Sequence, residues 1–481
     1  MTRAVCVGGS NTQYTPAATC VCQNKKNGVL EQNVEFWCSL HYSECGRTTM
    51  ISTKQGEFRE YGDSTGQRGF EVSDVFQKCY RFLENPYAET DGRTDDRALA
   101  EAVYTAISPP ANSGPWMEVD GRRILQFGSN DYLGLASHPA VRQRAAEVAA
   151  EYGIGLPMGS RLLTGTVAHH LELEDKLARF KQTQAAIVFS AGALAMMGTL
   201  AALCGPEDVL FIDEFAHATL KFGARASAAT IRVFRHNDAN HLETLLQRTQ
   251  TRGGRVVVVD GVYSMQGDLA PLPDLVDLRR RYGFRLLVDD AHANGVFGPQ
   301  GRGTPFHFGV QDEVDLHLGT FSKAFGTIGG FVAGPYEVIT YLRYHAPTYI
   351  FTKALPLVVT EATSVALELL EKADDRRAKL WQNTRHLQQS LRDAGFRLGE
   401  TQSPITPVLT NGTRALYWAY QLREKFGIWG APATYPAVKM GTSLLRLVPT
   451  ALHEPQDIDY LVNSLTAIES SLSLGSLMPV I

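Results

Sequence analysis

The chain has 481 residues, with 46 Lys and Arg against 50 Asp and Glu, which gives a formal net charge of −4. This length is ample for a large core and favours two or three structural units. The balanced charge indicates neither a nucleic acid nor an anionic membrane surface as a partner. No apolar run is long enough to span a bilayer, and the N-terminus lacks the apolar core of a secretory signal, so we expect a cytoplasmic protein.

Residues 1–70 are expected to form a cysteine-rich leader that is poorly ordered. Six of the seven cysteines lie before Tyr80, polar residues dominate, and apolar periodicity is weak. Ligand types that zinc prefers are present, in Cys20, Cys22, Cys38, His41 and Cys45. Their spacings fit no zinc-finger pattern, so we predict no metal site.

Residues 71–160 are expected to form an N-terminal arm of helices with one hairpin. Three helices are predicted, over residues 71–83, 97–107 and 139–152. Residues 116–127 are predicted to form a β-hairpin that turns at Asp120-Gly121.

Five short apolar runs predict the strands of a large domain over residues 161–356. They are bounded by turn residues and span residues 185–189, 208–212, 256–259, 284–288 and 315–320. Such runs, separated by segments of helix length, are typical of parallel strands buried on both faces. Polar clusters that follow the strands should therefore meet at one edge of the sheet, where open α/β sheets bind ligands.

Three residues that follow these strands have the chemistry that an aldehyde cofactor on a pyridine ring requires. The amine of Lys323 can condense reversibly with an aldehyde. Asp289 would hold the pyridine nitrogen protonated, which makes the ring an electron sink, and His292 would reach the ring hydroxyl. Together they predict pyridoxal phosphate. The alternative is a surface lysine at 323 and a solvated helix cap at Asp289-Asp290.

The motifs around these residues resemble those of a known family. They are VDDAH over 288–292, GTFSKAFG over 319–326 and SMQGDLAPL over 264–272, and they are similar to the α-oxoamine synthases. This is the fold-type-I pyridoxal phosphate family of serine palmitoyltransferase, 8-amino-7-oxononanoate synthase, 2-amino-3-ketobutyrate CoA ligase and 5-aminolevulinate synthase. The resemblance extends from about Gly128 to the C-terminus.

The resemblance implies an aminotransferase-like α/β fold. A mostly parallel seven-stranded sheet would be flanked by helices, and a smaller α/β domain would follow over residues 357–481. In that smaller domain we predict helices over residues 357–371, 376–394 and 455–471 and strands over residues 408–409 and 444–448.

Further residues would hold the cofactor phosphate. Gly192, Ala193 and Leu194 open a helix after the strand at 185–189, where free backbone N–H groups favour an anion. The alternative for these three residues is tight packing of the helix on the sheet. Hydroxyl groups that could reach the phosphate are those of Thr320, Ser322 and, by resemblance, Thr352 from the neighbouring subunit.

Two residues are matched to the cofactor ring. His217 corresponds to the family histidine that stacks on the ring, although a lone histidine at a strand end is more often a capped core residue. Ser264 follows the strand at 256–259 and is expected on the side of the ring hydroxyl.

Arg446 and Asn130 are the predicted substrate contacts. Arg446 matches the family arginine that clamps the amino-acid carboxylate, a task suited to a bidentate guanidinium. A single arginine after Leu444-Leu445 resembles serine palmitoyltransferase more than the family members that use glycine. The alternatives are an edge-strand arginine facing water and, for Asn130, a turn that caps the helix at 139–152.

Four sites depart from the family pattern. One lies after the strand at 185–189, where the family usually has an aromatic residue in place of Ala193 and an asparagine in place of Met196. Leu156-Pro157-Met158 replaces small residues in a loop near the amino-acid and acyl sites, Gln266 replaces an aspartate, and Lys353 stands where a small polar residue is usual. They leave the identity of the substrates open.

The predicted reaction is the decarboxylative condensation of an α-amino acid with an acyl thioester, carried by coenzyme A or an acyl carrier protein, to give an α-amino ketone. A homodimer with a shared active site is implied by the resemblance. The alternatives are a pyridoxal phosphate aminotransferase or decarboxylase and a non-catalytic subunit of a heteromeric synthase. The presence of Lys323 argues against the non-catalytic subunit.

Overall fold

The computed structural model describes residues 114–475, except Asp120 and Pro436, and four short strands nearer the N-terminus. Residues 1–75 and 76–481 form two separate compact units. In the first unit the strands pair antiparallel, β1 (Thr19–Val21) with β4 (Glu35–Trp37) and β2 (Lys25–Lys26) with β3 (Val29–Leu30). The leader side chains considered for zinc and the helices predicted over 71–83 and 97–107 lie outside the described residues.

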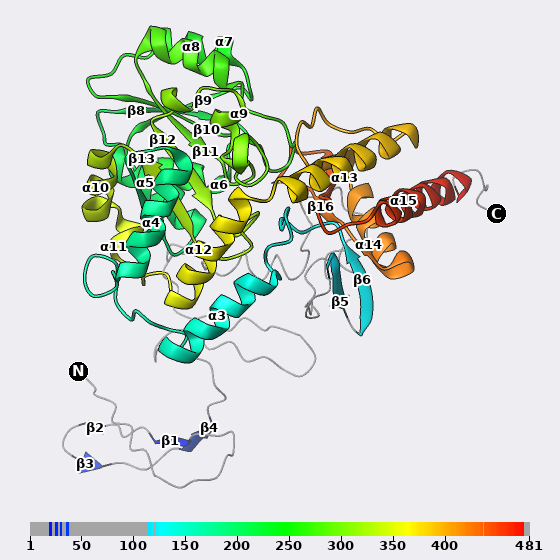
Figure 1. Cartoon of the computed structure of the whole chain (residues 1–481), viewed down its shortest axis with the longest axis horizontal. Coiled ribbons are helices and arrows are strands. Elements are labelled where there is room, and N and C mark those ends of the chain that lie inside the picture. Colours follow the sequence, from blue (N-terminus) through cyan, green and yellow to red (C-terminus); the bar gives the residue numbers. More distant parts are fainter. Residues whose placement is uncertain are drawn as a thin grey trace. The chain divides into compact units, whose positions relative to one another are not determined.

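A seven-stranded sheet forms the centre of the second unit (Figure 1). Its spatial order is β7 (Ala185–Phe189), β13 (Gly330–Gly334), β12 (Leu316–Thr320), β11 (Arg285–Asp289), β10 (Arg255–Asp260), β8 (Val209–Asp213) and β9 (Thr230–Phe234). Neighbours from β12 to β9 are parallel, whereas β13 runs antiparallel to both of its neighbours. The predicted sheet is confirmed, and the five predicted strands agree within one residue at each end. The residue pattern had not indicated β9 or β13.

Helices cover both faces of this sheet, which explains why its strands are apolar throughout. One face buries Ile212, Val258 and Leu318 in a core shared with α5 (Gly192–Leu203), α6 (Ala218–Ala226) and α10 (Tyr336–His345). On the other face, α4 (Ala168–Lys181) and α12 (Leu357–Glu371) cover one end, and α7 (Ala239–Arg248) and α8 (Leu272–Tyr282) cover the other. Short helices complete this part: η1 (Pro299–Gly301), α9 (Thr304–His307), η2 (Gln311–Glu313) and α11 (Pro347–Ile350).

The C-terminal part is a smaller α/β unit, as predicted. Its antiparallel sheet has the order β14 (Thr406–Asn411), β17 (Thr442–Leu447) and β16 (Ala431–Ala433). The helices packed with it are α13 (Asp374–Asp393), α14 (Arg414–Phe426) and α15 (Pro455–Gly475), which Figure 1 shows grouped beside the large sheet. β17 is the central strand of this small sheet, and Arg446 lies on it.

The predicted hairpin is present as β5 (Trp116–Val119) and β6 (Arg122–Gln126), and the predicted helix after it is α3 (Pro139–Tyr152). β6 also pairs in parallel with β15 (Ile428–Trp429), and Leu125 and Phe127 belong to the core of the C-terminal unit. The hairpin is thus attached to the C-terminal unit, while the four domain ranges given above stay predictions. No helix in the described part of the chain combines the length and apolar character needed to cross a membrane.

Candidate active site

The carboxyl edge of the large sheet brings the predicted residues together. Parallel pairing of β10 and β11 places Asp260 directly beside Asp289. β12 ends in Thr320, and Lys323 follows in a turn closed by the N–H of Gly326, which donates to the Lys323 carbonyl at 2.8 Å. Because these strands are parallel, their ends lie at one edge, as the sequence predicted.

Lys323 is an amine whose surroundings favour the neutral form. Burial lowers its pKa to about 8, and the guanidinium of Arg446 lowers it as well, while Asp289 and Asp260 oppose the shift. A lysine of ordinary pKa would be almost wholly protonated at neutral pH. Lys323 instead offers a useful fraction of unprotonated amine, the form that attacks an aldehyde.

Asp289 and Asp260 are both buried carboxyl groups. Burial raises the pKa of Asp289 to about 6, opposed by the charge of Lys323 and by the N–H of Ala291, which donates to Oδ1 at 3.0 Å. Burial and the charge of Asp289 together raise the pKa of Asp260 well above its usual range. Burial thus disfavours two charges on this pair, and the charge of Lys323 favours the ionised form of Asp289, where a protonated pyridine nitrogen would require it.

His292 is a neutral imidazole inside the site. Its Nδ1 lies 2.7 Å from the hydroxyl of Tyr132. Burial lowers the pKa of His292 well below its usual range, and the charges of Lys323 and Arg446 add to this effect. A neutral ring whose Nδ1 is occupied by Tyr132 has Nε2 as its remaining polar atom, which suits a hydrogen bond to a ring hydroxyl.

His217 lies at the same edge, and the residue is partly open to solvent and partly buried. It caps α6, because its Nδ1 accepts the N–H of Thr219 at 3.3 Å, and its own N–H donates to Oδ2 of Asp260 at 2.9 Å. Burial lowers the pKa of His217, and so do the nearby charges of Lys323 and Lys221. The imidazole plane is thus free to stack on a ligand close to Lys323.

Helix α5 begins at this edge without a side-chain cap. Its N-cap residue, Ala191, makes no side-chain hydrogen bond. The first N–H groups of an α-helix have no partner within the helix. Those of Gly192, Ala193 and Leu194 therefore point out of the helix start together with the positive end of its dipole.

Thr320 and Ser322 add hydroxyl groups beside this helix start. A Cβ at Gly192 would lie 2.5 Å from Oγ1 of Thr320, so this approach of backbone to side chain requires glycine. Oγ1 of Thr320 donates to the carbonyl of Gly329 at 3.0 Å and lies 2.8 Å from Oγ of Ser322. An uncapped helix start beside two hydroxyl groups fits a phosphate. With Lys323 and Asp289 nearby, the residues present fit pyridoxal phosphate.

Arg446 is buried but has no carboxylate partner among residues 114–475. Its Nε donates to the carbonyl of Ser264 at 2.7 Å, and its Nη2 donates to Oδ1 of Asn130 at 3.0 Å. A buried guanidinium without an anionic partner is costly. This favours a carboxylate ligand and argues against the alternative of an edge-strand arginine facing water.

The structure places two other predicted contacts in local bonds. The carbonyl of Ser264 contacts Arg446, whereas the predicted role of its hydroxyl at the ring stays a prediction. The hydroxyl of Thr352 donates to the carbonyl of Thr348 at 2.5 Å within the same chain. Its predicted contact with a neighbouring subunit also stays a prediction.

A charged hydrogen-bonded network links the end of β8 to the loop after β10. His236 lies between two carboxylates, with Nδ1 2.9 Å from Asp213 and Nε2 2.7 Å from Asp268. Burial disfavours the charged imidazole, but these hydrogen bonds outweigh it and raise the pKa of His236 to about 9. Asp213 also accepts the N–H of Phe215 at 2.7 Å. The imidazolium therefore joins the end of β8 to the loop after β10.

The sequence had not assigned a catalytic or binding role to Asp260, Tyr132 or His236. Asp260 follows its apolar run directly, as Asp289 follows the next one, and this parallel was the available signal. Tyr132 and His236 lie in segments that resembled family motifs, with a structural role expected for the segment of His236, but their partners lie 160 and 32 residues away in the chain.

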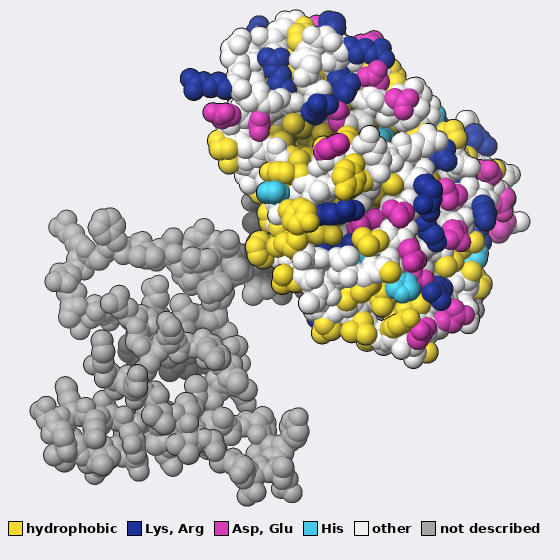
Figure 2. Space-filling model, turned by 60° about the vertical axis from the view of Figure 1, so that its left-hand side comes forward, with side chains coloured by type: hydrophobic (Ala, Val, Ile, Leu, Met, Phe, Trp, Pro, Cys, Tyr) yellow, Lys and Arg dark blue, Asp and Glu magenta, His cyan; other side chains and the backbone are white. Residues whose placement is uncertain are grey.

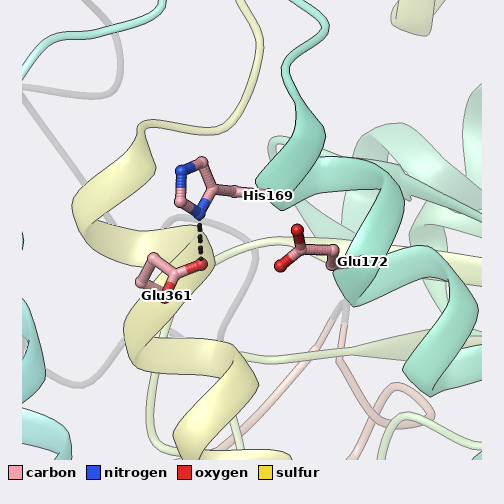
Figure 3. A group of neighbouring side chains, drawn as sticks. All are labelled: His169, Glu172 and Glu361. Carbon is pink, nitrogen blue, oxygen red and sulfur yellow. Dashed lines mark hydrogen bonds and ion pairs between the residues drawn. The ribbon is translucent and has the colours of Figure 1, made fainter.

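A group of potential metal ligands on the surface has a structural explanation. His169, Glu172 and Glu361 bring ligand atoms within 4.8 Å of one another, and Figure 3 shows His169 and Glu361 in contact. Glu361 is already engaged, because it accepts from His169 at 2.8 Å and pairs with Arg144. These bonds join α12 to α4 and α3, and His169 and His170 stand in the first turn of α4.

Comparison with known proteins agrees with this geometry. Residues 122–465 match the family model described as aminotransferase class I and II. The chain is 39% identical over 391 residues to a cysteate-C-fatty acyltransferase from Capnocytophaga ochracea, covering 80% of this chain and 93% of that protein. It is 41% identical over 360 residues to an 8-amino-7-oxononanoate synthase from Exiguobacterium sibiricum, covering 74% and 91%. Among solved structures, the serine palmitoyltransferase of Sphingomonas wittichii matches with a TM-score of 0.78 at 34% identity, covering 84% and 100%.

Proposed function

We propose a reaction for this chain on the premise that it belongs to the aminotransferase class I and II family and, within it, to the pyridoxal-phosphate-dependent α-oxoamine synthases. The chain is an acyltransferase of that family. The reaction is the condensation of an α-amino acid with an acyl thioester of coenzyme A or of a carrier protein. The thiol and carbon dioxide leave, and the product is an α-amino ketone.

This proposal is carried by two residues that lie at one edge of the sheet. Lys323 is an amine of lowered pKa, and Arg446 is a buried guanidinium without an ion pair among the described residues. Arg446 holds the carboxylate of the amino acid, which replaces the anionic partner that its burial calls for. Lys323, once free, takes the proton from the α-carbon. Because Arg446 also lowers the pKa of Lys323, the group that binds the substrate helps to keep the proton acceptor neutral.

The bound cofactor would supply an aldehyde and a ring that stabilises negative charge at the α-carbon. Asp289 would hold the ring nitrogen protonated, and His217 would stack on the ring and fix its tilt. His292 would donate to or accept from the ring hydroxyl. The helix start at residues 192–194, with the hydroxyl groups of Thr320 and Ser322, would bind the phosphate.

We propose a small polar amino acid such as serine as the amino donor. The support is the single arginine on β17, together with the likeness to a serine palmitoyltransferase structure. The similarity to a cysteate-C-fatty acyltransferase makes cysteate, whose sulfonate replaces the serine hydroxyl, the first competitor to test.

We also propose that the enzyme is a homodimer. Large hydrophobic side chains are exposed around the loops next to the site: Ile154 (80%), Met158 (62%), Leu163 (80%), Ile328 (61%) and Phe351 (84%). Figure 2 shows hydrophobic side chains gathered on one face of the described part of the chain. Exposed apolar surface of this kind marks an interface, and a second copy would bring Thr352 near the phosphate site of its partner.

The test is a thiol-release assay on the purified holoenzyme with a long-chain acyl-CoA. Serine, cysteate, alanine and glycine are supplied in turn, and Lys323→Ala is the control. We expect stoichiometric thiol and carbon dioxide with one of these amino acids and none with the control. Conversion of the amino acid to its keto acid without thiol release would establish an aminotransferase instead. Loss of carbon dioxide alone would establish a decarboxylase.

A further inference from the structure

Lys181 and Asp290 form a fully enclosed ion pair close to the carboxyl edge of the large sheet. Lys181 is the last residue of α4, which lies along this sheet in Figure 1, and Asp290 directly follows β11. Both side chains have an exposed fraction of 0%, and Nζ of Lys181 lies 3.4 Å from Oδ2 of Asp290. Well-packed apolar residues of similar size stabilise a core as well as a buried ion pair does. Stability alone therefore does not account for these two charges.

The carboxylate of Asp290 fits closely among its neighbours. Thr304, 14 residues further along the chain, donates its N–H to Oδ2 at 3.2 Å and its hydroxyl to Oδ1 at 2.6 Å. A Cβ at Gly303 would overlap Oδ2, and a Cβ at Gly261 would overlap Oδ1. The two glycines thus leave room for the carboxylate, and the hydrogen bonds hold it in one orientation.

Asp290 is also the anchor of the turn that carries His292. The N–H of Asp290 donates to the carbonyl of Leu318 on β12 at 3.0 Å. The carbonyl of Asp290 accepts the N–H groups of Ala293 and Asn294, each at 2.9 Å. His292 lies inside this turn, so a shift of Asp290 would move the imidazole with it.

The charge of Asp290 bears on Asp289, the preceding residue, and raises its pKa in addition to the effect of burial. Burial raises the pKa of Asp290 itself, and the ammonium of Lys181 opposes this rise. Among the described residues, the pair is also faced by Arg302, whose charge lowers the pKa of Lys181 after burial, and by His317, whose pKa burial lowers to about 3. Lys181 is thus the countercharge for a carboxylate that would otherwise add to the charge of Asp289.

We propose that Lys181 and Asp290 are positioning residues of the cofactor site. Their ion pair holds the turn of His292 in place and balances the charge that lies beside Asp289. The inference rests on the proposed function, in which His292 would contact the ring hydroxyl and Asp289 the ring nitrogen. Neither member of the pair would itself touch the cofactor, because both side chains are fully enclosed.

The test starts from the holoenzyme and measures the dissociation constant of pyridoxal phosphate by equilibrium dialysis, together with the absorption spectrum of the bound cofactor. The variants are Lys181→Met, Asp290→Asn and the double variant. The double variant removes both charges at nearly constant volume, so it should fold even where a single variant leaves a buried charge unpaired and does not. We expect each single variant to weaken cofactor binding at least about tenfold. The double variant should lose no more than either single one, because both residues act through one ion pair.

Arg279→Met is the matched control. It breaks the ion pair between α8 and Asp315, which directly precedes β12 at the opposite end of the same strands. This variant should lower the thermal midpoint and leave the dissociation constant and the spectrum of the cofactor as in the wild type. The same behaviour in the double variant would overturn the proposal, because a purely structural ion pair would do no more.

Asp289→Asn and His292→Asn are measured in parallel, so that failure of their proposed roles is seen independently of the ion pair. Groups that contact the ring nitrogen and the ring hydroxyl tune the electronic state of the cofactor. The absorption maximum of the double variant should therefore shift in the same direction as in one of these two variants. Weakened binding in the pair variants, beside wild-type binding and absorption in Asp289→Asn and His292→Asn, would overturn the positioning role.

Discussion

Asp260 and Asp289 lie side by side at the carboxyl ends of β10 and β11, and burial raises the pKa of both, that of Asp289 to about 6 and that of Asp260 well above its usual range. Two buried carboxylates at this distance cannot both ionise cheaply. The charge of Lys323 lowers the pKa of both groups, but the charge of Asp289 adds to burial in raising that of Asp260, whose Oδ2 also accepts the N–H of His217. We therefore expect Asp260 to be the protonated acid, which positions His217, and Asp289 to be the ionised one, which would serve the cofactor.

These different roles predict that replacement by asparagine has a small effect on catalysis at Asp260 and a large effect at Asp289. Asp260→Asn replaces a protonated acid by a group of the same shape that still accepts from His217, so kcat/KM should fall by no more than about threefold. Asp289→Asn removes the charge opposite the ring nitrogen, and kcat/KM should fall at least about a hundredfold. Steady-state kinetics on the two cofactor-loaded variants measure both changes in kcat/KM. An equal loss in the two variants would contradict the assignment of the charge to Asp289.

Lys323 should make cofactor uptake depend on pH. Its pKa of about 8 means that half of the amine is unprotonated at pH 8 and that the unprotonated fraction levels off about one pH unit higher. The rate at which cofactor-free protein takes up pyridoxal phosphate should therefore rise between pH 6 and about 9 and then level off, as followed by absorbance. Arg446→Gln removes a charge that lowers this pKa, so the levelling should move to higher pH. A rate independent of pH from 6 to 9 would refute the assignment.

Arg446 and Asn130 should act on the same kinetic constant. Arg446→Lys keeps the charge but loses the planar fork, so the KM for the amino acid should rise at least about tenfold. Asn130→Ala removes the acceptor that orients Nη2, and a rise of about tenfold is expected there too. Because both act through one guanidinium, the double variant should be less impaired than the product of the two effects. Full multiplication would show that Asn130 acts elsewhere.

The sequence predicted what depends on local pattern and chemical type. Apolar runs located five strands within a residue, and the residues after them named Lys323, Asp289 and His292. The strand β13 was not indicated by the residue pattern, because Gly330 and Gly334 bound a run of only three apolar residues and its pairing is decided by neighbours. Gly330 is required there because a Cβ would meet the backbone of Gly192.

Contacts between side chains of neighbouring strands and loops could not be predicted, because they depend on strand register and on segments that are distant in the sequence. The coupling of Asp260 to Asp289 follows from the pairing of two strands, and that of Tyr132 to His292 joins the loop after the hairpin to the loop after β11. The lone arginine at 446 could be matched to a clamp, but its lack of an ion pair among the described residues appears only in the folded chain.

His236 should make stability depend on pH. Its pKa is about 9 in the fold and near 6.5 in an unfolded chain. A raised pKa means that the stabilisation is fully present below about pH 6.5 and is lost as the pH rises through 9. The thermal midpoint of the wild type should therefore fall over this window, by an amount equivalent to about 1–2 kcal/mol after screening, and His236→Asn should lack that component. His386→Asn, at a surface pair with Asp459, is the control and should keep it.

Phe351 should control assembly, because it is the most exposed of the large hydrophobic side chains next to the site, at 84%. The segment that contains Phe351 packs against the loop at 156–160. The N–H of Ala354 donates to the carbonyl of Gly159 at 3.1 Å, and the backbones of Lys353 and Ser160 form an isolated β-bridge. A charge placed at Phe351 would have to be buried in the proposed dimer, which costs several kcal/mol unless it is paired. Sedimentation should therefore show that Phe351→Asp is a monomer at concentrations where the wild type is a dimer. Val233→Asp, at an exposed residue of β9, should stay dimeric.

Since Thr352 would serve the phosphate of the partner, the monomer should also retain pyridoxal phosphate less well. A dimeric Phe351→Asp would remove this surface from the interface.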